Sequence, residues 1–227
     1  KQKPITFAFF YFCIIMTEDL IKAAEDKYKA ILETWCRNLF SETYIPSHDY
    51  LHHARVWEYA KQLMRHLFSA GMTNDNILPE KAIIAVFFHD TGLTVNKGAD
   101  HGKESRKICR EFLLQSATDT VFHNEILDAV EKHDDKNYGS VSSPASLESI
   151  VAVADDMDAF GHIGVLRYWE IYTMRRLDTS DIPRMIISNA ESRFRHLEST
   201  YHMFPGLIGE QKARLDFLVS FYTTLTK

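Results

Sequence analysis

Apolar residues recur at spacings of three and four along most of the chain, which is the pattern of helices with one buried face. Residues 18–40 show this pattern, and a second helix is predicted from about Asp49 to His66, ending near Gly71. Further helices are predicted over residues 79–88, 101–116, 121–133, 145–158, 163–177, 181–202 and 207–226. No stretch alternates apolar and polar residues as a half-buried strand would. The pattern therefore predicts an all-α fold.

Local signals mark where some of these helices begin and end. Thr17, followed by acidic residues, is typical of a helix N-cap. Pro79 suits the first turn of the third predicted helix, and Gly92 is placed to terminate it. No repeat and no linker divides the chain, so we expect a single domain over residues 16–227.

The composition narrows the classes of function. The chain has 227 residues and a formal net charge of −5, so no basic field indicates a nucleic-acid partner. Cys13, Cys36 and Cys109 are too few and too scattered for a disulfide framework. A reducing compartment fits this cysteine usage best, and we expect a cytoplasmic protein.

The first 15 residues form an apolar extension with a basic start. The apolar stretch from Ile5 to Met16 is short for a membrane span, and no small-residue cleavage site follows it. We interpret residues 1–15 as a segment upstream of a natural start at Met16. The alternative is an uncleaved anchor, and without such an anchor no membrane partner is expected.

Three His-Asp dipeptides begin at residues 48, 89 and 133, so the dipeptide alone indicates little. Only His89-Asp90 closes an apolar helix, AIIAVFFHD. Burying an unpaired charge costs free energy, and buried charged groups are normally paired or bound to a metal. His48-Asp49 instead opens a helix, which Asp49 or Ser47 would cap.

Two other helices direct polar side chains from apolar faces. His52 shares a face with Val56, because residues four apart lie together on a helix. Asp155 and Asp158 likewise share one face of a later helix. Together with the His-Asp doublet, these residues supply two imidazoles and at least two carboxylates. Such a set suits Mn²⁺, Fe²⁺, Zn²⁺ or Mg²⁺.

The order of four of these side chains resembles the H…HD…D pattern of the HD superfamily of metal-dependent phosphohydrolases: His52, His89, Asp90 and Asp155. The flanking segments HDYLHHARVW, FFHDTGLT, DHGKESRKICREFL and ADDMDAFGHIGVLR are similar to segments that occur in the same order in that family. The resemblance covers about residues 45–170, and it selects His52 rather than His53 as a ligand.

The resemblance implies a single-domain, HD-type helical bundle that binds one divalent metal ion, Mn²⁺, Fe²⁺, Mg²⁺ or Zn²⁺, through those four residues. A bound ion of this kind lowers the pKa of water and polarises a phosphoryl oxygen, which prepares water to attack phosphorus. The implied substrate is a phosphoester or phosphoanhydride of a nucleotide or another small phosphorylated metabolite.

Other polar residues near the motifs are candidates for substrate binding and proton transfer. His101 and His133 lie on inward faces, and each is a candidate general acid, phosphate contact or ligand of a second ion. Asp158 would orient a ligand, act as a base or pair with Arg167. The cations nearest in sequence, and therefore the candidates for binding substrate phosphate, are Lys97 and Lys103.

Further charged residues have a less specific interpretation. Arg55 is a candidate substrate contact, although a bridge to a carboxylate such as Asp90 is favoured. Asp156 and His53 are expected to face solvent. The pair Arg175-Arg176 and the segment ESRFRHLEST are also expected to form solvated faces.

Two features keep other functions open. Some nucleotidase-like relatives carry a glutamate where this chain has Leu93, and HDTGLT also resembles a branch that hydrates a nitrile-like substrate. The alternatives are an HD-family hydratase acting on a carbon–nitrogen bond and a non-catalytic, metal-bound module that binds a ligand. Phe217, Leu218 and Phe221 would either close the core or form the seam of a possible homodimer.

Overall fold

The computed structural model describes residues 7–43, 45–96, 100–116, 119–135 and 143–226. Every regular element in these residues is a helix and none is a strand, which confirms the predicted all-α fold. The α-helices are α1 (Phe7–Phe40), α2 (Tyr50–Ser69), α3 (Leu78–Phe88), α4 (His101–Gln115), α5 (His123–Lys132), α6 (Leu147–Asp158), α7 (Gly161–Met174), α8 (Ile182–Tyr201) and α9 (Pro205–Thr223). Short 3₁₀ turns are η1 (Pro46–His48), η2 (Thr91–Thr94) and η3 (Thr120–Phe122).

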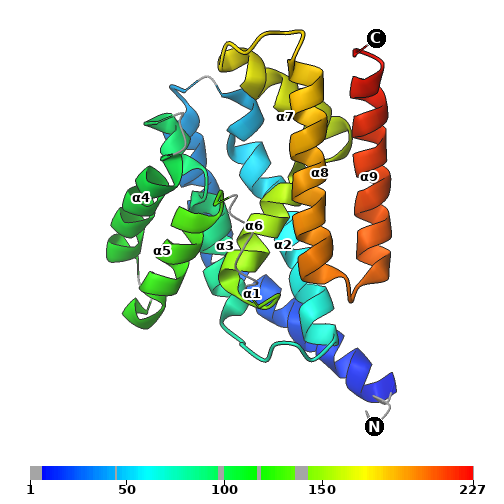
Figure 1. Ribbon diagram of the computed structural model, residues 1–227. Coiled ribbons are helices and arrows are strands. Elements are labelled where there is room, and N and C mark those ends of the chain that lie inside the picture. Colours follow the sequence, from blue (N-terminus) through cyan, green and yellow to red (C-terminus); the bar gives the residue numbers. More distant parts are fainter. Residues whose placement is uncertain (1–6, 44, 97–99, 117–118, 136–142, 227) are drawn as a thin grey trace.

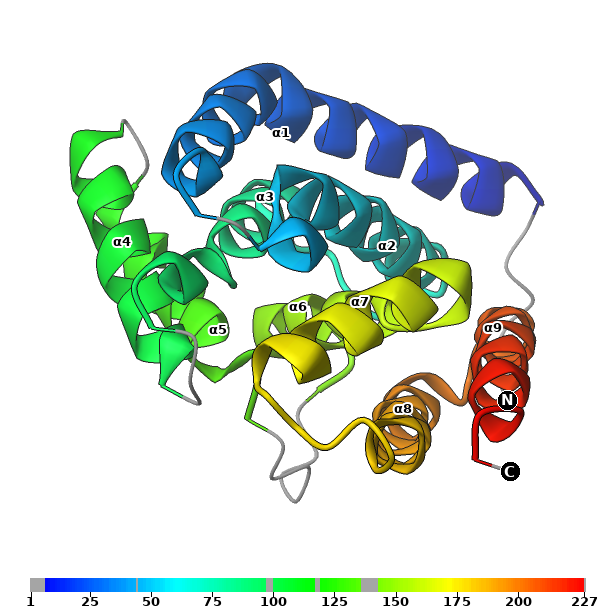
Figure 2. The same cartoon turned by 90° about the horizontal axis from the view of Figure 1, so that it is seen from above.

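Helix α3 lies at the centre of the molecule. Its residues Ala82 to Phe88 are almost completely buried, which is the expected position of a helix that is apolar on all sides. Helices α1, α2, α5 and α6 pack around it, and α4 pairs with α5 at one end of the bundle (Figure 1). The view from above shows α1 along one side, with α8 and α9 as a pair on the opposite side (Figure 2).

The start of α1 differs from the prediction. The helix begins at Phe7, so Thr17 lies inside it and is buried rather than capping its first turn. The sequence contains no proline or glycine between Pro4 and Phe40, so nothing interrupts the helix at Thr17.

Two glycines show how the prediction of helix ends succeeded and failed. Gly71 has φ +65° directly after α2, as expected of a glycine that ends a helix. The role predicted for Gly92 is wrong, because α3 already ends at Phe88 and Gly92 lies within η2. A Cβ at Gly92 would lie 2.0 Å from the carbonyl oxygen of His101. Glycine is needed there so that η2 can approach the start of α4 closely.

The C-terminal apolar residues divide between core and surface. Leu218 is fully buried, whereas Phe217 and Phe221 are about two-fifths exposed on α9. Leu218 therefore closes the core, and the homodimer stays a prediction. A search of the described part of the chain for helices with the length and apolarity that a bilayer requires found none.

Candidate metal centre

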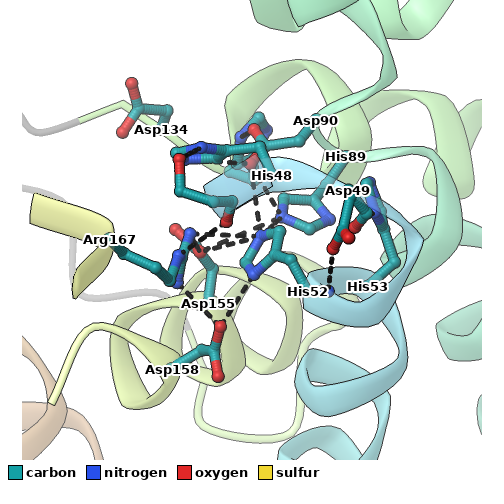
Figure 3. Close-up of polar contacts among 12 residues, drawn as sticks. His48, Asp49, His52, His53, His89, Asp90, Asp134, Asp155, Asp158 and Arg167 are labelled. Atoms are coloured by element: carbon teal, nitrogen blue, oxygen red, sulfur yellow. Dashed lines mark hydrogen bonds and ion pairs between the residues drawn. The ribbon is translucent and has the colours of Figure 1, made fainter. Parts of the chain in front are cut away.

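Three helix ends bring the predicted ligands together (Figure 3). His52 lies in the first turn of α2, His89 and Asp90 follow the last residue of α3, and Asp155 lies in the last turn of α6. The start of α2 is held by Asp49, whose carboxylate accepts the backbone N–H groups of Leu51 and His52 at 2.9 and 3.2 Å. Asp49 is thus the N-cap, as its place before the helix predicts.

Four candidate ligand atoms converge at this point, all within 4.8 Å of one another and all from buried residues. The Nε2 atoms of His52 and His89 are 3.1 Å apart. Oδ2 of Asp90 lies 3.3 and 3.4 Å from these two nitrogens. Oδ1 of Asp155 lies 3.5 Å from Nε2 of His52 and 3.9 Å from Nε2 of His89.

The hydrogen bonds behind the two imidazoles show which nitrogen carries the proton. Nδ1–H of His52 donates to the Asp158 carboxylate at 2.8 Å, and Nδ1–H of His89 donates to the Val86 carbonyl at 2.7 Å. With a single proton on each ring, held on Nδ1 by these bonds, each ring presents a lone pair on Nε2 to the other. Oδ1 of Asp155 is buried and has no hydrogen-bond donor. Apart from Nη2 of Arg167, which lies 3.3 Å from Nε2 of His52, the atoms that converge here are acceptors, and such a set fits a divalent cation.

The charges around the cluster keep its carboxylates ionised. Burial by itself would raise the pKa of Asp90, but the adjacent imidazoles, His89 first among them, hold it well below the usual value. Burial acts on Asp155 in the same way, and there Arg193 and Arg167 hold the pKa well below its usual range. Two ionised carboxylates and two imidazole lone pairs favour a bound cation.

A second group of donors adjoins the first. Oδ1 of Asp90 lies 3.2 Å from Nε2 of His101 and 3.0 Å from Nε2 of His133. Nδ1–H of His133 donates to the Val130 carbonyl at 2.7 Å, so its Nε2 also presents a lone pair. These three atoms lie within 4.8 Å of one another, close enough to share a metal ion. Asp90 therefore directs one oxygen toward each group.

Asp158 lies behind His52, with its side chain fully buried. Its carboxylate receives Arg55 Nε at 2.8 Å and Arg167 Nη1 at 2.9 Å in addition to His52. Burial raises the pKa of Asp158, but Arg167, His52 and Arg55 together hold it below the usual value. Among the roles considered for Asp158, the geometry favours orientation of His52 and pairing with Arg167. Arg55 bridges to Asp158 rather than to Asp90.

A cavity of about 220 Å³ lies beside the cluster. It is lined by candidate metal ligands from both clusters and by residues of α7 and α8. The basic and aromatic side chains in its lining are Arg167, Arg175, Arg193, Tyr168 and Tyr172. The cavity therefore combines candidate metal ligands with groups that bind anions and planar or apolar substituents.

The HD domain family model matches residues 50–159, from the start of α2 to the residue after α6. The chain contains an HD domain. The HD superfamily consists of metal-dependent phosphohydrolases, so the resemblance drawn from the motifs is confirmed, and both donor groups lie in the matched segment. Comparison with curated proteins and with solved structures found no match.

Of the two lysines predicted to bind phosphate, the one that the structure describes does not line this cavity. Lys103 is largely exposed, and its ammonium pairs with Asp100 at 2.7 Å. It does not line the cavity, and neither does Arg55. Lys97 lies outside the described residues.

Two residues expected at the surface are buried. Asp156 accepts from Arg193 Nη1 at 2.7 Å and from His196 Nδ1 at 2.8 Å. His53 is fully buried, and its Nδ1–H donates to the Asp49 carbonyl at 2.9 Å. The prediction was wrong because both helices are covered on more than one side: α2, α5 and α8 pack against α6, which carries Asp156, and α1, α3 and α6 pack against α2, which carries His53.

Arg193 is the main site residue that the sequence analysis assigned wrongly, because its segment ESRFRHLEST was expected to form a solvated face. It lies on α8, outside the matched HD segment, and its Nη1 donates to Oδ2 of Asp155 at 2.9 Å. The signal was available, because Arg193 is in helical phase with Ile186, Ala190 and Leu197, which are all fully buried. His48 was also missed; it lines the cavity, with Nε2 3.8 Å from Oδ2 of Asp90.

Proposed function

We propose that the protein is a metal-dependent phosphohydrolase that cleaves a phosphoester or phosphoanhydride of a nucleotide or another small phosphorylated metabolite. One observation carries the proposal. Four buried candidate ligand atoms lie within 4.8 Å of one another, and Oδ1 of Asp155 makes no hydrogen bond, its nearest cation being Nη2 of Arg167 at 3.5 Å. This arrangement lies beside a cavity with three arginines, which suits an anionic substrate.

In this proposal His52, His89, Asp90 and Asp155 hold one divalent ion, Mn²⁺, Fe²⁺, Mg²⁺ or Zn²⁺. When bound, such an ion supplies an acidified water and polarises a phosphoryl oxygen. The protein supplies the orientation. Asp158 and the Val86 carbonyl fix the two imidazoles through their Nδ1–H groups, and Arg193 holds Asp155 so that Oδ1 remains available.

His101 and His133 have two proposed roles. Either imidazole, when protonated on Nε2, would deliver a proton to the departing oxygen, since both line the cavity. Alternatively, both would join Oδ1 of Asp90 to hold a second ion. Elemental analysis of the purified protein distinguishes the two. Two ions per chain, falling to one in His133→Ala, would favour the second role.

The test of the function is phosphate release from a panel of nucleotides and sugar phosphates with Mn²⁺, Mg²⁺, Fe²⁺ and Zn²⁺. Asp90→Ala is measured in parallel, and we expect its activity to fall to background. The matched control is Asp128→Ala, which removes an exposed carboxylate that pairs with Arg106 and does not line the cavity. No phosphate release by the metal-loaded parent would contradict the proposal and favour the hydratase or the non-catalytic module.

A further inference from the structure

Arg167 lines the cavity, and its guanidinium is directed toward His52, Asp155 and Asp158 (Figure 3). It lies on α7, beyond the matched HD segment, and is 8% exposed. Two of its three guanidinium nitrogens are committed to the protein. Nε donates to the carbonyl of Ser47 at 3.0 Å, and Nη1 donates to Oδ2 of Asp158 at 2.9 Å. The plane of the guanidinium is therefore fixed.

The third nitrogen, Nη2, is directed at the candidate metal ligands. It lies 3.3 Å from Nε2 of His52 and 3.5 Å from Oδ1 of Asp155. These are two of the four atoms proposed to hold the metal. The single lone pair on Nε2 of His52 serves either a metal or an N–H donor, but not both. A bound cation would therefore take the acceptors that Nη2 contacts in the metal-free protein.

With those acceptors taken, the N–H groups of Nη2 would face the cavity that Arg167 lines. A buried donor needs a new acceptor, and a phosphoryl oxygen is a strong partner for a guanidinium. We propose that Arg167 contacts the substrate directly, donating from Nη2 to a non-bridging oxygen of the phosphoryl group once metal is bound. This inference rests on the proposed function and specifies which cation binds the reacting phosphate.

Arg193 is not expected to act in the same way. Its Nη1 contacts Oδ2 of Asp155 and Oδ1 of Asp156, and neither atom is among the four proposed for the metal. Metal binding therefore leaves both contacts of Arg193 in place. Arg193 remains a positioning residue, whereas Arg167 is released toward the cavity.

Arg55 provides a matched control for Arg167. It also pairs with Asp158, through Nε at 2.8 Å and Nη2 at 3.0 Å, but it does not line the cavity. Arg55→Gln and Arg167→Gln each remove one arginine from the same carboxylate. If Arg167 acted only by orienting His52 through Asp158, the two variants would have similar effects.

The experiment is a calorimetric titration of inorganic phosphate into the Mn²⁺-loaded protein, after a separate titration of Mn²⁺ alone. Loss of a charge-assisted contact predicts phosphate binding about ten- to a hundredfold weaker in Arg167→Gln. Arg55→Gln should change it by less than about threefold. We expect Arg167→Gln to bind Mn²⁺ at least as well as the parent, because a competing cation has been removed.

Parent-like phosphate affinity in Arg167→Gln, or an equal loss in Arg55→Gln, would overturn the inference. Loss of Mn²⁺ binding in Arg167→Gln would also overturn it, since Arg167 would then be a positioning residue only. Arg167→Lys keeps a cation and serves if the glutamine variant does not fold. We expect phosphate binding about tenfold weaker in it, because lysine lacks the planar fork of donors, and unchanged binding would count against the proposal.

These results are separable from the test of the function. Arg167-dependent phosphate binding in a protein that hydrolyses none of the phosphorylated substrates would support the anion contact and refute the phosphohydrolase. If the parent is active and its phosphate affinity does not depend on Arg167, the phosphohydrolase would be supported and the contact between Arg167 and the phosphate refuted.

Discussion

The candidate site has two regions that are built differently. The ligand region, on α2, α3 and α6, presents lone pairs and carboxylates from short segments with a strong local pattern. The arginine region, on α7 and α8, supplies Arg167, at the end of the motif segment ADDMDAFGHIGVLR, and Arg193, from a helix whose local sequence looks like that of any amphipathic helix. The comparison shows that a metal-binding pattern states which charges are buried but not which residues compensate them.

The largest expected effect comes from the ligand region. Asp90 contacts both donor groups, so Asp90→Ala should abolish metal binding and phosphate release. When the free metal concentration is a hundred times the Kd, binding to the parent would raise the free energy of unfolding by about 2.7 kcal/mol. Added Mn²⁺ should accordingly raise the melting temperature of the parent and leave that of the variant unchanged. Unchanged metal content and melting temperature in Asp90→Ala would refute the ligand assignment.

The next effect tests the arginine region. Arg193→Met leaves the buried carboxylates of Asp155 and Asp156 without their shared guanidinium. Removing one partner of such a buried network should lower the free energy of unfolding by about 3 kcal/mol, measured by urea denaturation of the metal-free protein. Arg195→Met, at an exposed position on the same helix, is the control. A similar loss of unfolding free energy in both variants would show that Arg193 does not compensate the buried carboxylates of the ligand region.

Asp158→Asn tests the contact between the regions, since Asp158 joins His52 to Arg167. The amide keeps an oxygen for His52 but removes the charge that orients and polarises the imidazole. Metal affinity should fall roughly tenfold, at the lower end of the range for residues that support metal ligands. Calorimetry with Mn²⁺ measures it, and an affinity equal to that of the parent would show that His52 is oriented by packing alone.

The smallest effect is expected at Lys103. Its side chain is 64% exposed and pairs only with Asp100 among the contacts described. Lys103→Gln should change stability by less than about 0.5 kcal/mol and should not weaken phosphate binding. A tenfold loss of phosphate affinity would mean that the first turn of α4, and not the arginine region, holds the substrate.

Much of the ligand region could be predicted because its signals are local. The spacing of His52 and Val56 places the imidazole on the buried face of α2, and a charged doublet at the end of the apolar α3 requires a partner. Charge compensation could not be predicted in this way. Arg55, Arg167 and Arg193 are chemically alike, and only one of the three both lines the cavity and faces the metal-ligand atoms.

The sequence by itself determined the helices and the set of candidate ligands, because helical periodicity and the chemistry of imidazole and carboxylate are expressed within a few residues. Only the tertiary structure decided which cations serve them. Arg167 meets His52 across 115 residues of chain, and Arg193 meets Asp155 across 38. Such contacts depend on how whole helices pack, because the long side chain of an arginine meets its partner only once the two helices are in place.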